Sequence, residues 1–137
     1  MHRQDIGQVG ELIVAQRLLQ DGWEVFTPVS QNTRVDMIAI KEDRLIKLQV
    51  KTTTETNKHG SFPLYLRKNH AESKYDYFYE ADDFDYFAVV HLPSNTLVFI
   101  STAEAMLCKH EVKFSLLRGA EKRPDNKKRF VEDYATL

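Results

Sequence analysis

The fold is decided by residues 35–53, VDMIAIKEDRLIKLQVKTT, where two apolar segments rich in β-branched residues flank the polar tetrapeptide KEDR at 41–44. This pattern predicts a β-hairpin. Because the side chains of a strand alternate between its two faces, the second strand has an apolar face and a more polar one. The apolar face carries Ile46, Leu48 and Val50. The other face carries Leu45, Lys47, Gln49 and Lys51.

A carboxylate also lies within this apolar region, because Asp36 opens the first strand of the hairpin. A buried charge is costly unless it is paired or bound to a metal. An aspartate, an amide and a lysine that converge in apolar surroundings therefore indicate a functional site formed by Asp36, Gln49 and Lys51. The alternative is a plain amphipathic hairpin whose polar face is solvated.

A glutamate falls on the apolar side of the helix predicted near the N-terminus. The apolar stripe of that helix continues from Glu11 through Val14, Ala15 and Leu18. A glutamate in this stripe needs a partner or a route to solvent, so Glu11 is a candidate paired or functional residue. Gly7 and Gly10 lower the helix propensity, which indicates that another element packs closely there.

The remaining elements follow from the same kinds of signal. The N-terminal helix is expected to begin near Ile6, with Asp5 as N-cap and Gln8 at capping-box spacing, and to end at Gly22. Pro63 restricts its own strand to an edge or a late start. Together the elements predict an α/β fold with a central mixed β-sheet flanked by helices. The remaining predicted elements are strands at 23–29, 62–66, 85–92, 96–101 and 111–117, a helix at 103–109 capped by Thr102, and a short helix or loosely held tail at 126–134.

Composition narrows the class of protein. The 137 residues are 42% hydrophobic and 28% charged, which is typical of a globular protein, and one domain over 1–137 is expected. The single cysteine, Cys108, excludes an internal disulfide and fits a reducing compartment. With no secretory signal and no apolar run near the ~20 residues of a membrane span, we expect a cytoplasmic protein with no membrane partner.

A metal site built from histidine and cysteine is not expected, because these residues lack the close paired spacing of zinc sites. The residues concerned are His59, His70, His91, His110 and Cys108. His91 lies within a predicted strand, where a histidine at the edge of the core is the more common case.

The charges are unevenly distributed along the chain. The net charge of −1 gives no general basis for DNA binding, which depends largely on Lys and Arg. However, residues 76–85 carry five acidic and no basic groups, whereas residues 118–129 carry six basic groups against two acidic ones. A basic C-terminal extension from about residue 118 can therefore present a basic surface. A solvated tail is the alternative.

Taken together, Asp36, Gln49-Val50-Lys51 and the helical Glu11 resemble the PD-(D/E)xK nuclease superfamily, in which a hairpin supplies Asp, then an acidic residue, any residue and Lys. The sequence is most similar to the small nucleases related to group I intron homing endonucleases, and more distantly to Holliday-junction resolvases. The likeness extends to three further segments, Gly10-Glu11, Gly22-Trp23-Glu24-Val25 and Phe84-Asp85-Tyr86-Phe87-Ala88-Val89. It implies a restriction-endonuclease-like core of αβββαβ-type order.

The sequence departs from the commonest pattern at two positions. Val35 replaces the proline before Asp36, which carries no chemistry. Gln49 replaces the carboxylate, and because a hard cation prefers charged oxygens, this change is expected to weaken metal binding. The related intron nucleases are understood to use glutamine at this place.

The resemblance implies a Mg²⁺-dependent DNA endonuclease that hydrolyses phosphodiester bonds, with Mn²⁺ as a substitute for Mg²⁺. The implied metal ligands are Asp36, the amide oxygen of Gln49, the backbone carbonyl of Val50, and Glu11. Lys51 would orient the nucleophile or offset charge on the phosphate, so that the implied catalytic set is Glu11, Asp36, Gln49 and Lys51.

Double-stranded or branched DNA is the expected partner. Composition alone suggests a set of basic residues for contact with the DNA backbone: Arg34, Lys58, Arg67, Lys68 and Lys74. A small nuclease that cuts both strands needs two active sites, so a homodimer or homotetramer is expected. Two alternatives remain: a structure-specific nuclease similar to Holliday-junction resolvases, and a non-catalytic member of the same fold that binds nucleic acid or a partner protein.

Overall fold

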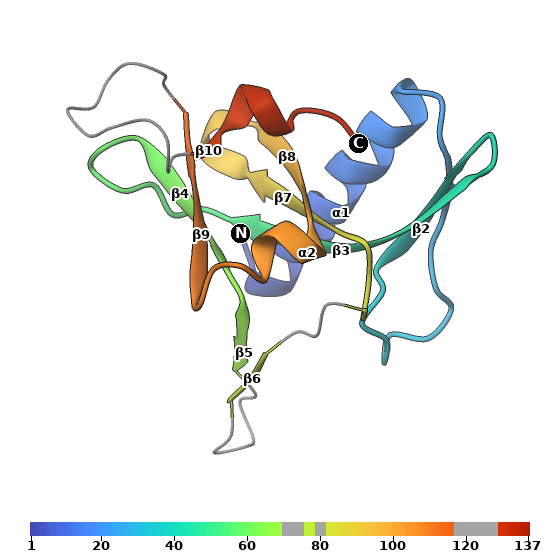
Figure 1. The fold of residues 1–137 in the computed structure, drawn as a ribbon, viewed down its shortest axis with the longest axis horizontal. Helices are drawn as coiled ribbons and strands as arrows, with labels where there is room; N and C mark the ends of the chain where they lie inside the picture. The colour runs from blue at the N-terminus through green and yellow to red at the C-terminus, as the bar shows by residue number, and fades with distance from the viewer. Residues whose placement is uncertain (70–75, 79–81, 117–128) are drawn as a thin grey trace.

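The predicted hairpin forms the middle of a five-stranded sheet (Figure 1). The structure, a computed structural model, describes residues 1–69, 76–78, 82–116 and 129–137. Strands β2 (Met37–Lys41) and β3 (Arg44–Thr53) pair antiparallel through a two-residue turn. Glu42 in this turn has a φ of 57°, the left-handed conformation that such short turns use. The hairpin prediction is therefore confirmed.

Two different neighbours hold the two halves of β3. Its first half pairs with β2 as far as the partners Met37 and Leu48. Its second half, from Leu48 to Thr53, pairs in parallel with β7 (Tyr86–His91). Along the β2 side of β3, no strand in the described ranges pairs beyond Leu48. The second half of β3 thus has one edge inside the sheet and one edge facing the start of β2.

The strands of the described ranges form three sheets. The five-stranded sheet has the order β1-β2-β3-β7-β8, in which only the β3–β7 pair is parallel, so the sheet is mixed as predicted. A three-stranded sheet has the order β10-β9-β4, and β5 pairs with β6 in a ribbon that extends away from both (Figure 1). The remaining strands are β1 (Glu24–Phe26), β4 (Ser61–Tyr65), β5 (Arg67–Asn69), β6 (Asp76–Phe78), β8 (Thr96–Ser101), β9 (Glu111–Ser115) and β10 (Arg129–Phe130).

Within the described residues, the helices are α1 (Arg3–Gln20), α2 (Thr102–Ala105) and the 3₁₀ segments Leu92–Ser94 and Val131–Tyr134. None of the helices in the described residues is long and apolar enough to cross a membrane.

Two buried clusters lie on opposite faces of the five-stranded sheet, because successive side chains of β7 belong alternately to one cluster and the other. Ala88 and Val90 face α1, and they belong to the first cluster together with Val14, Leu18, Leu48 and Val50. Phe87 and Val89 face the three-stranded sheet, and they belong to the second cluster together with Phe62, Leu64, Val112 and Phe114. The central sheet is therefore covered by α1 on one side and by β4 and β9 on the other.

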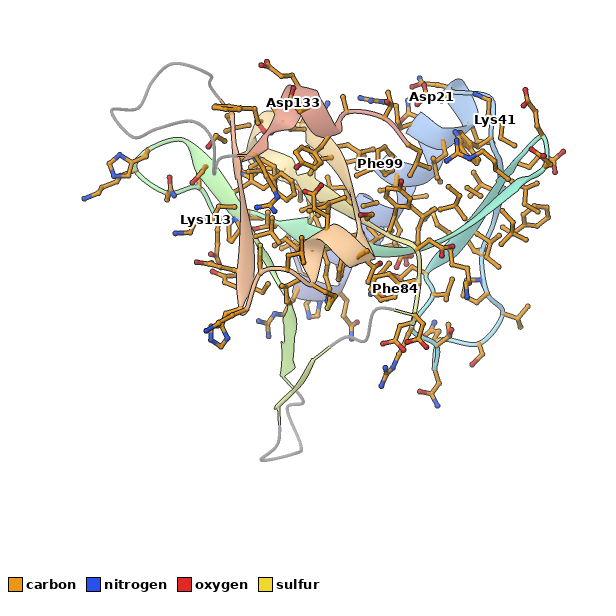
Figure 2. All side chains as sticks on the ribbon, in the orientation of Figure 1. Asp21, Lys41, Phe84, Phe99, Lys113 and Asp133 are labelled. Atoms are coloured by element: carbon orange, nitrogen blue, oxygen red, sulfur yellow. The ribbon has the colours of Figure 1, made fainter. Side chains whose placement is uncertain are left out.

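The end of α1 is attached to the hairpin. Gly22 follows the helix with a φ of +88°, which confirms the predicted stop. The ammonium group of Lys41 donates a hydrogen bond of 2.7 Å to the backbone oxygen of Asp21, and Figure 2 shows these two residues side by side. Lys41 and Arg44 both lie over the ring of Trp23, at 5.7 and 5.2 Å from its centre.

The C-terminal residues pack against both buried clusters. Glu104 accepts hydrogen bonds from Arg129 at 2.8 Å and from Tyr134 at 2.6 Å. Arg17 on α1 donates to the backbone oxygen of Ala135 at 3.3 Å, which places the chain end beside α1 (Figure 1). Burial and the hydrogen bond to Glu104 raise the pKa of Tyr134 to about 12. Burial acts to raise the pKa of Glu104, but its hydrogen bonds from Tyr134 and Arg129 outweigh this effect and lower it.

Several boundaries differ from the sequence expectations. The N-cap of α1 is His2, whose ring accepts a hydrogen bond from the backbone N–H of Gln4, so Asp5 lies in the first turn instead. Ser101 caps α2, not Thr102, and the helix ends at Ala105 instead of Lys109.

Further boundaries are corrected among the strands and the C-terminal segment. The strand expected at 23–29 contains only Glu24–Phe26. The segment expected at 126–134 as a helix or tail contains β10 and a 3₁₀ turn, while its first residues lie outside the described ranges.

The predicted α/β class with a mixed central sheet is correct, and the αβββ beginning is found. After β3, the described residues form β4, β5 and β6 where the αβββαβ order calls for a helix. Pro63 lies on β4, an edge strand of the three-stranded sheet, as predicted.

Candidate active site

Asp36 is held against β3 at the point where β2 begins. Its backbone N–H donates to the carbonyl of Leu48 at 2.8 Å, which continues the hairpin by one more hydrogen bond. Its carboxylate oxygen Oδ2 accepts a hydrogen bond of 2.7 Å from the backbone N–H of Val50. The carboxylate therefore occupies the edge of β3 that β2 leaves uncovered.

Val50 directs its main-chain groups toward this same carboxylate. In a β-strand the N–H and C=O groups of one residue point to the same edge. Since the N–H of Val50 bonds to Asp36, its carbonyl oxygen also faces the edge where Asp36 lies.

Gln49 carries a buried amide oxygen. The residue is 8% exposed and stands opposite Phe87 of β7. Its Oε1 is one of two buried side-chain polar atoms in the described part of the chain with no hydrogen-bond partner, the other being Oγ1 of Thr52. Leaving a buried acceptor unpaired costs about 1–3 kcal/mol, so this oxygen is suited to accept a ligand.

Lys51 stands two residues further along the same face of β3, opposite Val89. Burial lowers the pKa of its ammonium group, while the negative charge of Asp36 acts in the opposite direction. The lysine and the aspartate are therefore close enough to interact electrostatically.

Glu11 reaches the same aspartate from α1. Burial raises the pKa of its carboxyl group, and the neighbouring charge of Asp36 raises it further. Two carboxylates that disfavour each other's charge are an arrangement that a bound cation relieves.

Asp36 thus interacts with three of the predicted residues, Glu11, Val50 and Lys51. It contacts Val50 directly and interacts electrostatically with Glu11 and Lys51, while Gln49 lies between Leu48 and Val50 on the same strand. In the described ranges no three His, Cys, Asp or Glu side chains form a group that could hold a metal ion. The available donors are two carboxylates, an amide oxygen and a main-chain carbonyl, all of them the oxygen ligands that Mg²⁺ prefers. This donor set fits a magnesium ion, although with less charge than three carboxylates supply.

Of the five residues suggested for DNA contact, the structure describes the side chains of Arg34 and Lys58. Arg34 forms an ion pair of 2.5 Å with Asp83, with side chains that are 47% and 15% exposed. Lys58 is exposed in the loop between β3 and β4. Arg67 and Lys68 lie on β5, but their side chains are outside the described part of the structure, as is Lys74 altogether. Arg34 therefore has an acidic partner that the sequence pattern did not indicate.

In the part of the chain that the structure describes, no histidine or cysteine belongs to a group of three or more potential metal-binding side chains. His91 is 1% exposed, stacks on Phe62 at 4.6 Å, and lies within hydrogen-bond distance of Thr56 and Ser94. Its position at the end of β7 is that of a core histidine, as predicted. His70 lies outside the described residues.

Thr52 was missed as a residue of interest. Its hydroxyl is buried beside Gly10, the glycine that precedes Glu11 on α1. The sequence signal that could have found this contact is Gly10 itself, because a glycine inside a helix indicates close packing. Gly7, which carried the same signal, has open space around it.

Two solved structures resemble this fold. The bacterial homing endonuclease I-Ssp6803I superposes with a TM-score of 0.82 at 18% identity, over 98% of this chain and 88% of that one. Hjc, a Holliday junction resolvase from the hyperthermophilic archaeon Archaeoglobus fulgidus, superposes with a TM-score of 0.53 at 17% identity, over 78% and 81% of the two chains. At these identities the likeness shows the fold, which is the expected restriction-endonuclease-like one.

Sequence comparison gives the family. No curated protein matches the sequence. The sequence model of the PD-(D/E)XK endonucleases, however, matches residues 1–136, which is nearly the whole chain. The chain therefore belongs to the PD-(D/E)XK endonuclease family.

Proposed function

We propose that this protein is a Mg²⁺-dependent DNA endonuclease of the homing-endonuclease type, with its active site at Glu11, Asp36, Gln49 and Lys51. The observation that carries the proposal is the position of Asp36. One carboxylate lies at the uncovered edge of β3 and interacts with a second acid and a lysine. On the same strand, Gln49 carries a buried amide oxygen that has no hydrogen-bond partner among the described residues.

The ligands for the metal would be Asp36, Glu11, the amide oxygen of Gln49 and the carbonyl oxygen of Val50. When bound, Mg²⁺ supplies polarisation of the scissile phosphate, a lowered pKa of coordinated water and charge for the leaving oxygen. Mn²⁺ would serve as a substitute. Because glutamine contributes no charge, Asp36 and Glu11 would carry most of the electrostatic binding.

Lys51 would act on the phosphate side of the site. Its ammonium group is partly desolvated, which strengthens its interaction with a nearby anion. Held beside Asp36 on a rigid strand, it would orient the attacking water or offset negative charge on the phosphate as that charge develops.

The decisive experiment compares Lys51→Ala with a lysine variant from another sheet. Removing one such electrostatic donor costs about 10²–10³-fold in rate, so Lys51→Ala should be nearly inactive on supercoiled plasmid DNA with Mg²⁺. Lys113→Ala, which removes an exposed lysine of β9 (Figure 2), should cut like the wild-type protein. Asp36→Ala should abolish cleavage while the fold remains, as judged by circular dichroism. An Asp36→Ala preparation that cuts as well as wild type would refute the assignment.

The substrate and the assembly belong to the same proposal. A four-way junction offered beside the plasmid distinguishes a homing-type nuclease from a junction resolvase. A homodimer or homotetramer would provide the two active sites needed to cut both strands, and sedimentation measures this directly.

A non-catalytic role has one specific observation in its favour, which is that Gln49 leaves the site without a third carboxylate. This role would be supported if Mg²⁺ and Mn²⁺ produced neither cleavage nor heat of binding in calorimetry.

A further inference from the structure

Gly10 brings α1 into direct contact with β3. A Cβ atom added at Gly10 would lie 1.7 Å from Oγ1 of Thr52, 2.9 Å from its Cβ and 3.1 Å from its Cγ2. The first two distances are shorter than real Cβ contacts. Rotation of the threonine side chain can move its hydroxyl, but the Cβ is fixed by the backbone of β3. No residue other than glycine fits at this position without a shift of the helix or the strand.

The threonine hydroxyl is not placed there for a hydrogen bond of its own. Oγ1 of Thr52 is buried and has no partner among the described residues. An unpaired buried hydroxyl is costly, so its position is set by the close approach of the two elements. By alternation along β3, Thr52 shares the α1-facing side with Leu48 and Val50, whereas Lys51 belongs to the opposite side.

The contact stands directly beside the proposed site in both elements. Gly10 precedes Glu11 on α1, and Thr52 follows Lys51 on β3. Asp36 interacts with both Glu11 and Lys51. The distance between α1 and β3 at the Gly10–Thr52 contact therefore determines how far Glu11 stands from Asp36.

We propose that Gly10 and Thr52 are positioning residues, whose contact seats α1 on β3 and so places the Glu11 carboxylate beside Asp36 at the metal site. The proposal rests on the proposed function of that site. A side chain at position 10 lifts the helix and moves Glu11 away, and loss of the threonine side chain loosens the same contact.

The test is a size exchange across the contact, with Gly7 as the matched control. Gly7 lies on the same helix with nothing within 4 Å of an added Cβ, so Gly7→Ala should leave metal binding unchanged. Gly10→Ala should raise the Mg²⁺ concentration for half-maximal cleavage and the Mn²⁺ dissociation constant from calorimetry by about 10- to 100-fold, as loss of a supporting contact does at metal sites. Gly10→Ala/Thr52→Gly should recover much of this loss, because it restores the space for the added methyl group.

A second substitution at position 52 separates the contact from the chemistry of the hydroxyl. Thr52→Val keeps the shape of the side chain and should retain wild-type metal dependence. If Gly10→Ala does not fold, Thr52→Gly tests the contact from the other side, with the same expected rise in both constants. A folded Gly10→Ala with unchanged metal dependence, or an exchange variant no better than Gly10→Ala alone, would overturn the positioning role.

The two proposals fail in different ways. A wild-type protein that binds Mn²⁺ but cuts no DNA overturns the nuclease function, and the positioning role is then judged from the Mn²⁺ dissociation constants alone. A wild-type protein that cuts DNA, with Gly10→Ala equal to it in metal dependence, overturns the positioning role and leaves the function standing. A wild-type protein that binds neither metal overturns both.

Discussion

Gln49→Glu should make the protein less stable without metal and more responsive to metal. The substitution adds a negative charge at a position of β3 that is 8% exposed and that precedes Val50, whose N–H binds the Asp36 carboxylate. Complete burial raises the pKa of a carboxyl group by up to about 3–5 units, and one unit corresponds to about 1.4 kcal/mol. With about 1–3 units at the edge of a site, the free energy of unfolding in EDTA should fall by about 1–4 kcal/mol at neutral pH.

Mg²⁺ should reverse this loss. A carboxylate is a better ligand for a hard cation than an amide. Each tenfold gain in affinity adds about 1.4 kcal/mol of stabilisation once the metal is in excess. The increase in the free energy of unfolding between EDTA and saturating Mg²⁺ should therefore be larger for Gln49→Glu than for wild type.

Urea unfolding, followed by circular dichroism in EDTA and in Mg²⁺, measures both effects. Gln16→Glu adds the same charge on the exposed side of α1 and should change neither quantity appreciably. Equal stability of Gln49→Glu and wild type in EDTA, or an equal gain from Mg²⁺, would refute the assignment of residue 49 to a metal site.

Three further predictions concern stability. Gly7→Ala should raise the free energy of unfolding by about 0.5–1 kcal/mol, because alanine favours the helix and nothing obstructs its methyl group. A lower free energy of unfolding in urea than that of wild type would contradict this. Tyr134→Phe removes the 2.6 Å hydrogen bond to Glu104 and should cost about 1–2 kcal/mol in the same assay. It should also remove the tyrosine that ionises at about pH 12 in an ultraviolet titration. Burial lowers the pKa of His91, against a smaller opposite effect of a backbone hydrogen bond at Glu55. The neutral ring therefore makes its complete contribution to the free energy of unfolding above about pH 6.5, the pKa of histidine in the unfolded chain. This contribution is lost as the pH falls through the lower pKa of the folded state. The free energy of unfolding of His91→Gln should fall less over this range, and parallel pH profiles would disprove the role of His91.

The elements that could be predicted are those determined by local sequence. The β2–β3 hairpin follows from two β-branched segments around a polar turn, and the end of α1 follows from Gly22. Pro63 indicated an edge strand because proline lacks the N–H that a central strand needs. Each of these signals acts over a few residues.

The errors in the predicted helix boundaries arose where tertiary contacts determine at which residue a helix begins. The ring of His2 caps α1 three residues earlier than Asp5 would, so that the helix gains most of a turn. Ser101 caps α2 because β8 ends there, although Thr102 is an equally good capping residue and instead bonds through its side chain to Phe84. Sequence alone does not choose between two adjacent capping residues.

The candidate site was only partly predictable for the same reason. Alternation along β3 indicated that Gln49 and Lys51 share a face, and Glu11 was conspicuous in an apolar stripe. The bond from Val50 to Asp36 depends on where β2 begins, and the contact of Gly10 with Thr52 depends on how α1 lies on the sheet. Neither follows from spacing along the chain.

Because β3 pairs with two different strands, its two halves can fold only at different stages of synthesis. The hairpin with β2 is local and can form within microseconds, but Leu48 to Thr53 must wait for β7, which is much later in the chain. Gln49 and Lys51 lie in this second half. A nascent chain still being synthesised, or a fragment released by proteolysis before β7, would carry every proposed catalytic residue and still lack the strand that aligns them. The proposed active site would therefore be aligned only after β7 has been made and has paired with β3.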